Sequence, residues 1–147
     1  MSGWRACPGV ILLLTGVQVA AQPVPEGIHT IREGQPTLCG TTAPSIEELQ
    51  AGIAARLPGL PGNERFVAYE DAQNMRVWTF TTDAHPAHPA VACRTVTEVD
   101  GRAQLGLEID CRSTRENCDA LYREFEALNA QMIRELEQAG GNEHSTG

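Results

Sequence analysis

The sequence predicts an α+β domain built from a helix, a four-stranded antiparallel meander and a second helix. Two observations support this fold class. Apolar residues recur at helical spacing within residues 46–57 and 118–136, and runs rich in β-branched and aromatic residues fill most of the chain between them. We expect both helices to cover the same face of the sheet. A pair of hairpins that dimerise through a sheet edge is the alternative architecture.

Residues 1–21 predict a signal peptide. Arg5 and the amino terminus charge the front of a short apolar run, which ends in Val19-Ala20-Ala21, small residues typical of a signal-peptidase site. The run is shorter than the roughly 20 residues that a membrane-spanning helix needs, so we favour cleavage over a retained anchor. The protein is therefore expected to be periplasmic or secreted, with no membrane span after cleavage.

Three further segments follow the signal peptide. Prolines and glycines interrupt residues 22–40, which are expected to form an extended N-terminal arm. Residues 41–139 are expected to form the single α+β domain. Residues 140–147 have too few apolar side chains to pack and are expected to form a disordered tail.

The first helix has clear start and stop signals. Ser45 and Glu48 form a capping box, in which a hydroxyl and a carboxylate satisfy backbone donors at the helix start. Pro58-Gly59 ends the apolar repeat, and residues 60–63 are then expected to be a loop.

The second helix is predicted from a second capping box, Ser113 with Glu116. Gly140-Gly141 is expected to end it. Its apolar stripe comprises Cys118, Leu121, Tyr122, Phe125, Leu128, Met132 and Leu136.

Four strands are predicted between the helices, at residues 65–70, 75–81, 91–99 and 102–111. The last of them alternates apolar and polar residues, which is typical of a strand with one wet face.

The turn at Asp100-Gly101 sets the register of the last two strands. A two-residue turn would place the apolar face of the last strand beside Arg94, Val96 and Glu98. A three-residue loop with a glycine bulge would add Val91, Cys93 and Val99 to that apolar face. We favour the three-residue loop.

The four cysteines that follow the signal peptide are predicted to form two disulfides, because export favours oxidation. In the favoured register Cys93 and Cys111 lie roughly 13 Å apart along the strands, beyond the ~7 Å limit for a bridge. The predicted pairing is Cys39–Cys93 with Cys111–Cys118, whose short separation in sequence keeps the second pair close. A zinc site built from these cysteines is the alternative, but the C-x-x-C spacing of common zinc motifs is absent.

The segment 83–89 is the candidate metal site. Pro86 and Pro89 favour extended geometry at the residues before them, which projects His85 and His88 to the same side. With Asp83 as a third ligand, the two imidazoles would suit zinc or copper. The simpler interpretation, which we favour, is a stiff connection between two hairpins whose prolines discourage edge pairing.

Arg76, Trp78 and Phe80 share one strand face and form a candidate binding surface. If both helices covered the other face, these aromatic side chains would be exposed and would mark a partner site. Burial in the core is the alternative, and we favour it.

Composition and motifs bound the function. Nineteen acidic residues against eleven arginines and no lysine give a net charge of −8, which disfavours nucleic acid and anionic membranes as partners. The chain carries no glycine-rich phosphate loop and no H-E-x-x-H motif. We expect a small exported, disulfide-bonded protein that binds a protein or small ligand without catalysis and without a cofactor. A metal-binding protein that uses the histidine segment is the alternative function.

Overall fold

The computed structural model describes residues 34–142, so the predicted signal peptide and most of the arm and tail lie outside the described residues. A small sheet pairs β1 (Thr37–Leu38) with β2 (Thr41–Thr42). The helices are α1 (Ile46–Ala54) and α2 (Arg115–Asn142). The main sheet contains β3 (Gly59–Leu60), β4 (Phe66–Asp71), β5 (Arg76–Thr81), β6 (Ala90–Val99) and β7 (Arg102–Cys111), and a single 3-10 turn (Ala72–Asn74) joins β4 to β5.

The main sheet is a five-stranded antiparallel meander in the order β3-β4-β5-β6-β7. The α+β class is confirmed, and the strand count of four is corrected by β3. This strand pairs Gly59 with Tyr69 and Leu60 with Ala68, in a segment that the sequence predicts as helix end and loop. Two residues are too few to show any alternation, so the pattern of the sequence carries no signal for β3.

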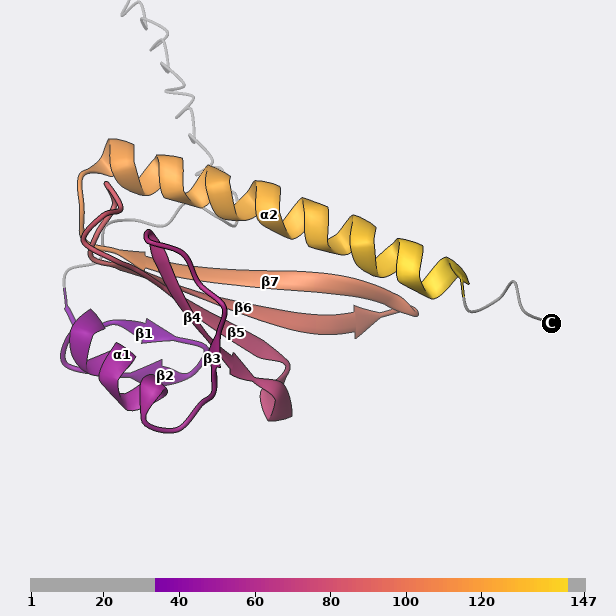
Figure 1. Cartoon of the computed structure of the whole chain (residues 1–147), viewed down its shortest axis with the longest axis horizontal. Helices are drawn as coiled ribbons and strands as arrows, with labels where there is room; N and C mark the ends of the chain where they lie inside the picture. The colour runs from indigo at the N-terminus through magenta and orange to yellow at the C-terminus, as the bar shows by residue number, and fades with distance from the viewer. Residues whose placement is uncertain (1–33, 143–147) are drawn as a thin grey trace, which may run out of the picture.

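The two helices cover opposite faces of the sheet, which corrects the expectation that they share one face. Figure 1 shows α2 lying along one side of β6 and β7, with α1 and the β1–β2 hairpin on the other side. Side chains alternate along a strand, so β6 contributes Val91 and Cys93 to one core and Ala90 and Ala92 to the other. The core against α1 comprises Leu38, Ile46, Leu49, Ile53, Trp78, Phe80, Val91 and Cys93. The core against α2 comprises Ala87, Ala90, Ala92, Ile109, Cys111, Cys118, Leu121 and Phe125.

The turn between β6 and β7 has two residues, so the favoured three-residue loop is wrong. Val99 pairs with Arg102, and both turn residues are left-handed, with φ of 52° at Asp100 and 75° at Gly101. Positive φ at both central positions is typical of a type I′ turn. The prediction failed because it assumed that only one face of these strands is apolar. In the structure both faces of β6 are buried, with Val91 and Cys93 in the core against α1 and Ala90 and Ala92 in the core against α2.

The disulfides join Cys39 to Cys93 and Cys111 to Cys118, as predicted. The reason why Cys93 and Cys111 do not pair differs from the predicted one. Cys93 belongs to the core against α1, whereas Cys111 belongs to the core against α2. A bridge between these two strand cysteines is therefore excluded by the sheet itself. Each disulfide instead ties one cover to the sheet.

Side-chain hydrogen bonds define the helix starts. Ser45 Oγ accepts the backbone N–H of Glu48 at 3.1 Å, which confirms Ser45 as the cap of α1. The cap of α2 is Thr114 and not Ser113, because Thr114 Oγ1 accepts the N–H of Asn117 at 3.3 Å. Ser113 is occupied elsewhere, since its hydroxyl donates to the carbonyl of Pro86 at 3.0 Å.

The C-terminal end of α2 lies beyond the expected stop. The helix runs through Gly140-Gly141 to Asn142, which corrects the predicted start of the tail at residue 140. Glycine costs a helix about 1 kcal/mol relative to alanine, and it ends one only where the backbone turns left-handed.

Within residues 34–142 no helix combines the length and apolar character needed to cross a bilayer.

Candidate functional site

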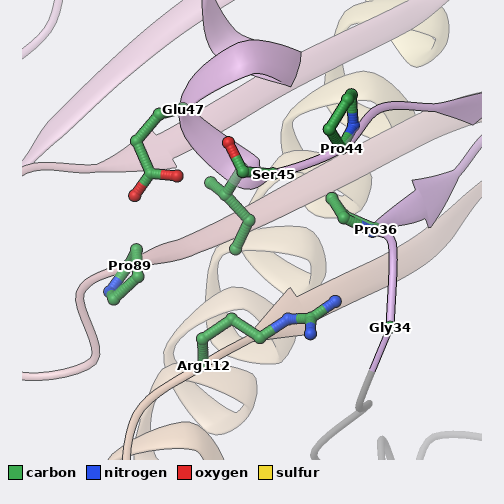
Figure 2. Close-up of a pocket in the computed structure, with 8 residues that line it drawn as sticks. Gly34, Pro36, Pro44, Ser45, Glu47, Pro89 and Arg112 are labelled. Carbon is green, nitrogen blue, oxygen red and sulfur yellow. The ribbon is translucent and has the colours of Figure 1, made fainter.

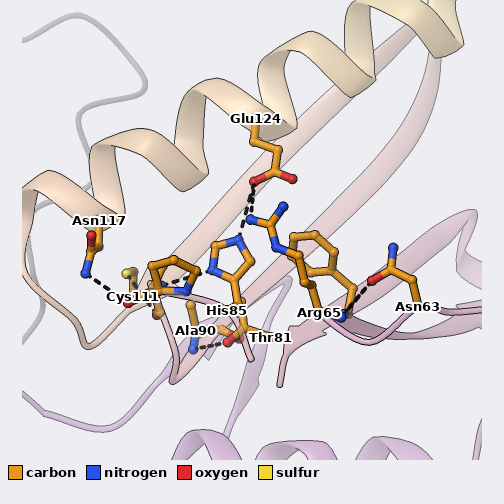
Figure 3. A network of polar contacts seen from close by, with 11 residues as sticks. Asn63, Arg65, Thr81, His85, Ala90, Cys111, Asn117 and Glu124 are labelled. Atoms are coloured by element: carbon orange, nitrogen blue, oxygen red, sulfur yellow. Dashed lines mark hydrogen bonds and ion pairs between the residues drawn. The ribbon is translucent and has the colours of Figure 1, made fainter. Parts of the chain in front are cut away.

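The histidine segment connects β5 to β6 and packs beneath the N-terminal half of α2 (Figure 3). Thr81 fixes one end of it to the sheet, because its hydroxyl accepts the N–H of Ala90 at 2.9 Å and lies 3.2 Å from the carbonyl of the same residue. Asn117 fixes the other side to α2, since its amide donates to the carbonyl of Pro86 at 2.9 Å. The connection is therefore part of the packed structure.

Both ring nitrogens of His85 are used within the protein. Nδ1 accepts the backbone N–H of Ala87 at 3.0 Å, so the ring hydrogen of the neutral imidazole lies on Nε2. Nε2 lies 3.3 Å from Glu124 Oε2 on α2 and donates to it. The ring is buried, and it packs against the tilted ring of Phe66 with a centroid distance of 4.9 Å. Such a histidine has no free lone pair for a metal ion or for general-base catalysis.

Glu124 joins this histidine to the loop that precedes β4. The same Oε2 atom lies 3.5 Å from the guanidinium of Arg65, so one carboxylate holds a buried imidazole and a half-exposed cation together. The backbone around Arg65 is fixed in turn by Asn63, whose Oδ1 accepts the N–H of Arg65 at 2.8 Å and that of Phe66 at 3.0 Å. The network links three segments and presents no nucleophile.

His88 differs from His85 in exposure and in partners. His88 is exposed, and its Nδ1 lies 3.0 Å from the carbonyl oxygen of Thr81. Asp83 is also exposed. Of the three predicted ligands, His85 is therefore buried, whereas His88 and Asp83 are at the surface. Among the described residues, no group of three His, Cys, Asp or Glu side chains is placed to hold a metal ion. Zinc or copper binding here stays a prediction, with His88 Nε2 as its one available imidazole nitrogen.

The proposed aromatic surface is corrected by burial. Trp78 is 2% exposed and Phe80 is 0% exposed, because α1 and the β1–β2 hairpin cover the face on which they lie. Arg76, on the same face, is half-buried and donates to the carbonyl of Cys39 at 3.1 Å. These three residues hold the α1 cover to the sheet.

A pocket of about 150 Å³ opens beside the start of α1 (Figure 2). Its lining residues are Gly34, Pro36, Pro44, Ser45, Ile46, Glu47, Pro89 and Arg112. Figure 2 shows the Arg112 side chain extending along the pocket toward Gly34 and Pro36, with Glu47 on the α1 side. Three prolines in the wall make the pocket rigid, because each fixes its own φ.

Asp110 neutralises the cation of this pocket. Its carboxylate is buried and accepts Arg112 Nε at 2.5 Å and Nη2 at 2.7 Å, a bidentate pair. This hydrogen bond raises the pKa of the Arg112 guanidinium, and the charge of Asp110 adds to the effect. The cation that lines the pocket is therefore held and balanced by a buried carboxylate, and the exposed carboxylate of Glu47 is a second charged group in the lining.

The residues without a counterpart in the sequence-based prediction include Arg112 and Glu124 of these sites, and also Arg94 on β6. Arg112 follows the last strand and Glu124 lies beside the apolar stripe of α2, positions where a charge is usually solvated. Arg94 is the clearest missed signal, because it directly follows Val91-Ala92-Cys93, an apolar run of a central strand. A charge directly after such a run, within a strand that has a neighbour on each side, is unusual enough to mark a candidate site.

Comparisons of the chain with protein-family models, with curated proteins and with solved structures find no match. The two disulfides nevertheless indicate an oxidising, extracellular environment.

Proposed function

We propose that this chain is a non-catalytic binding protein, exported to the periplasm or beyond the cell, that recognises a protein partner through the pocket beside α1. The observation that carries the proposal is the pocket itself, which is about 150 Å³ in volume and has three prolines in its wall. Pockets for drug-sized molecules measure roughly 300–1,000 Å³, whereas a cavity of about 150 Å³ holds a group the size of benzene. One large side chain of a partner fits this space better than a cofactor does.

The chemistry of the pocket supports an anchor of mixed character. Ile46 and the prolines offer apolar walls, while Glu47 and the Arg112–Asp110 pair offer polar groups on one side. Buried aromatic and arginine anchors that combine an apolar body with a polar tip dominate protein interfaces. The disulfide between Cys39 and Cys93 supports the same proposal, since it ties the segment that carries the pocket wall to the sheet.

The test is a capture experiment with a matched pair of variants. Glu47 lines the pocket, whereas Glu48 is exposed on the same turn of α1 and does not line it. Glu47→Trp and Glu48→Trp therefore change charge and size equally but differ in whether the new ring can cover the pocket. We expect proteins from an envelope extract to be captured by the wild type and by Glu48→Trp, and to be lost with Glu47→Trp, as read by mass spectrometry.

An identical set of captured proteins for all three forms would contradict recognition through the pocket. The absence of any specific capture by the wild type would contradict the binding function. Emission from the buried Trp78 is not a clean folding control here, because each variant adds a tryptophan, so circular dichroism checks that all three are folded.

A further inference from the structure

On the side of the sheet that α2 covers, Arg94 has no acidic partner among the residues that the structure describes. Arg94 lies on β6, opposite Val77 of β5 and opposite Leu107 of β7, on the face that α2 covers. Its guanidinium carbon lies 5.6 Å from the ring centroid of Phe125 on α2. Arg94 is half-buried in this setting, on a strand that has a neighbour on each side.

No carboxylate of residues 34–142 forms an ion pair with Arg94, although acidic residues outnumber basic ones by 19 to 11 in the chain. Its Nε atom is buried and has no hydrogen-bond partner. Burial lowers the pKa of the Arg94 guanidinium, because the charged form loses solvation there. The contact with Phe125 offsets only part of the cost of desolvating a guanidinium.

Two further polar groups on this face also lack partners. Thr79 is 6% exposed, and its hydroxyl has no hydrogen-bond partner. It pairs with Ala92, two residues before Arg94 on β6, and is therefore a diagonal neighbour of Arg94 on the same face. Asn129 lies one turn of α2 beyond Phe125, and its buried Oδ1 is unpartnered as well. Among the described residues, three buried polar groups without partners thus lie on the face that α2 covers.

We propose that this region binds a small carboxylate with an apolar body, whose carboxylate pairs with Arg94. The guanidinium fork matches the two oxygens of a carboxylate, and the Thr79 hydroxyl supplies a further donor. The apolar body has suitable surroundings, since Val77 and Leu107 flank Arg94 and are only half-buried. Leu128, on the same half of α2, is 42% exposed and extends the apolar surface.

The site is separate from the pocket of the proposed function. That pocket lies at the start of α1, whereas Arg94 lies under α2, on the face of the sheet that α1 does not cover (Figure 1). The Glu47→Trp variant should therefore bind the carboxylate as the wild type does, so failure of one proposal does not imply failure of the other.

The experiment uses hexanoate as the probe, with hexanol as the uncharged control. Calorimetry measures the affinity, and the side-chain N–H resonance of Arg94 reports the location in isotope-labelled protein. We expect saturable binding of hexanoate, a shift of the Arg94 resonance, and neither effect with hexanol.

Arg94→Met is the decisive variant, because methionine keeps an unbranched apolar stem against Phe125 and removes the charge. We expect hexanoate affinity to fall at least tenfold in Arg94→Met and to stay unchanged in Arg102→Met, where the arginine is exposed at the far end of the same hairpin. Unchanged emission from the buried Trp78 shows that each variant is folded. Equal affinity of Arg94→Met and wild type, or no saturable binding of hexanoate to the wild type, would overturn the proposal. If Arg94→Met does not fold, the resonance of Arg94 in the wild type decides by itself.

Discussion

Single polar side chains decide much of the local structure of this protein through the donor or acceptor that each one satisfies. His85 is the best example, because its two nitrogens are bonded to a backbone amide and to Glu124, which makes it a structural residue. Ser45 and Thr114 act at the helix starts, where the first backbone N–H groups have no partner within the helix. In each case the partner, and not the residue type alone, defines the role.

The cap of α1 can be tested directly. Ser45→Ala removes the acceptor for the Glu48 N–H, and we expect the free energy of unfolding to fall by about 1 kcal/mol. Ser45→Asp keeps an acceptor at the same position and should retain most of the stability. Chemical denaturation of the three proteins measures the difference. Equal stability of Ser45→Ala and wild type would show that the cap is unimportant here.

Tyr122 predicts a pH effect. Burial raises the pKa of its phenol, and the hydrogen bond to Glu126 and the charge of that carboxylate raise it further. A raised pKa in the folded state stabilises the protein fully below the unfolded pKa of about 10, and this contribution is lost as the pH rises through the folded pKa. Above about pH 10 the free energy of unfolding should therefore fall more steeply in the wild type than in Tyr122→Phe. Ultraviolet absorbance of the ionised phenol checks the pKa, and identical slopes for the two proteins would contradict the assignment.

Among the elements, the β6–β7 hairpin shows how a turn sets a register. Asp100 and Gly101 both adopt positive φ, so the turn has two residues and Val99 faces Arg102. A shift of one residue would exchange the two faces of β7, moving Ile109 and Cys111 away from α2. The turn therefore decides which side chains of β7 face α2 and which face the other side of the sheet.

Two glycine substitutions with opposite expected effects on stability test the conformation of the β6–β7 turn and of α1. Gly101→Ala places a side chain at a φ of 75°, and we expect it to destabilise the protein by roughly 1–2 kcal/mol. Gly52→Ala lies inside α1 with open space around it, and we expect it to stabilise by about 0.5–1 kcal/mol. Thermal unfolding compares both with the wild type. A stabilising Gly101→Ala would be incompatible with the observed turn.

At the scale of the whole molecule, two covers share one sheet, and each cover has its own disulfide. The bridge Cys39–Cys93 closes 54 residues of chain and holds the α1 cover. The bridge Cys111–Cys118 closes seven residues and holds the start of α2 against β7. Their positions on opposite faces explain why two separate bridges are used.

Removing the two bridges should have unequal effects. In the chain-entropy model the longer loop contributes about 4 kcal/mol and the shorter about 2 kcal/mol to the free energy of unfolding. Cys39→Ala/Cys93→Ala should therefore destabilise the protein about twice as much as Cys111→Ala/Cys118→Ala. Denaturant titration of the two double variants measures the difference, and a larger loss from the shorter bridge would contradict the model.

Particular elements show how far prediction from the sequence reached. The first cap and the four longer strands followed from local patterns, because capping residues and β-branched runs act within a few residues. The predicted cap at Ser113 and the predicted helix end at Gly140 are wrong, and the two-residue strand β3 was not predicted, since each depends on a partner distant in sequence or on a weak propensity. Among the candidate sites, burial of Trp78 in the core was the favoured interpretation and is observed. The sequence analysis gave Arg94 no role as a candidate site residue.

The sequence by itself determined the class of fold and the main elements, because these depend on local periodicity. It also favoured the observed cysteine pairing, although from a strand register that the structure corrects. Only the tertiary structure decided that α1 and α2 cover opposite faces, and hence which side of each strand is core. A strand that is apolar on both faces is compatible with either arrangement, so its pattern does not choose between them. This arrangement buried Trp78 and bonded His85 to Glu124. It also left Arg94 under α2 without a counter-charge among residues 34–142, which is the basis of the proposed carboxylate site.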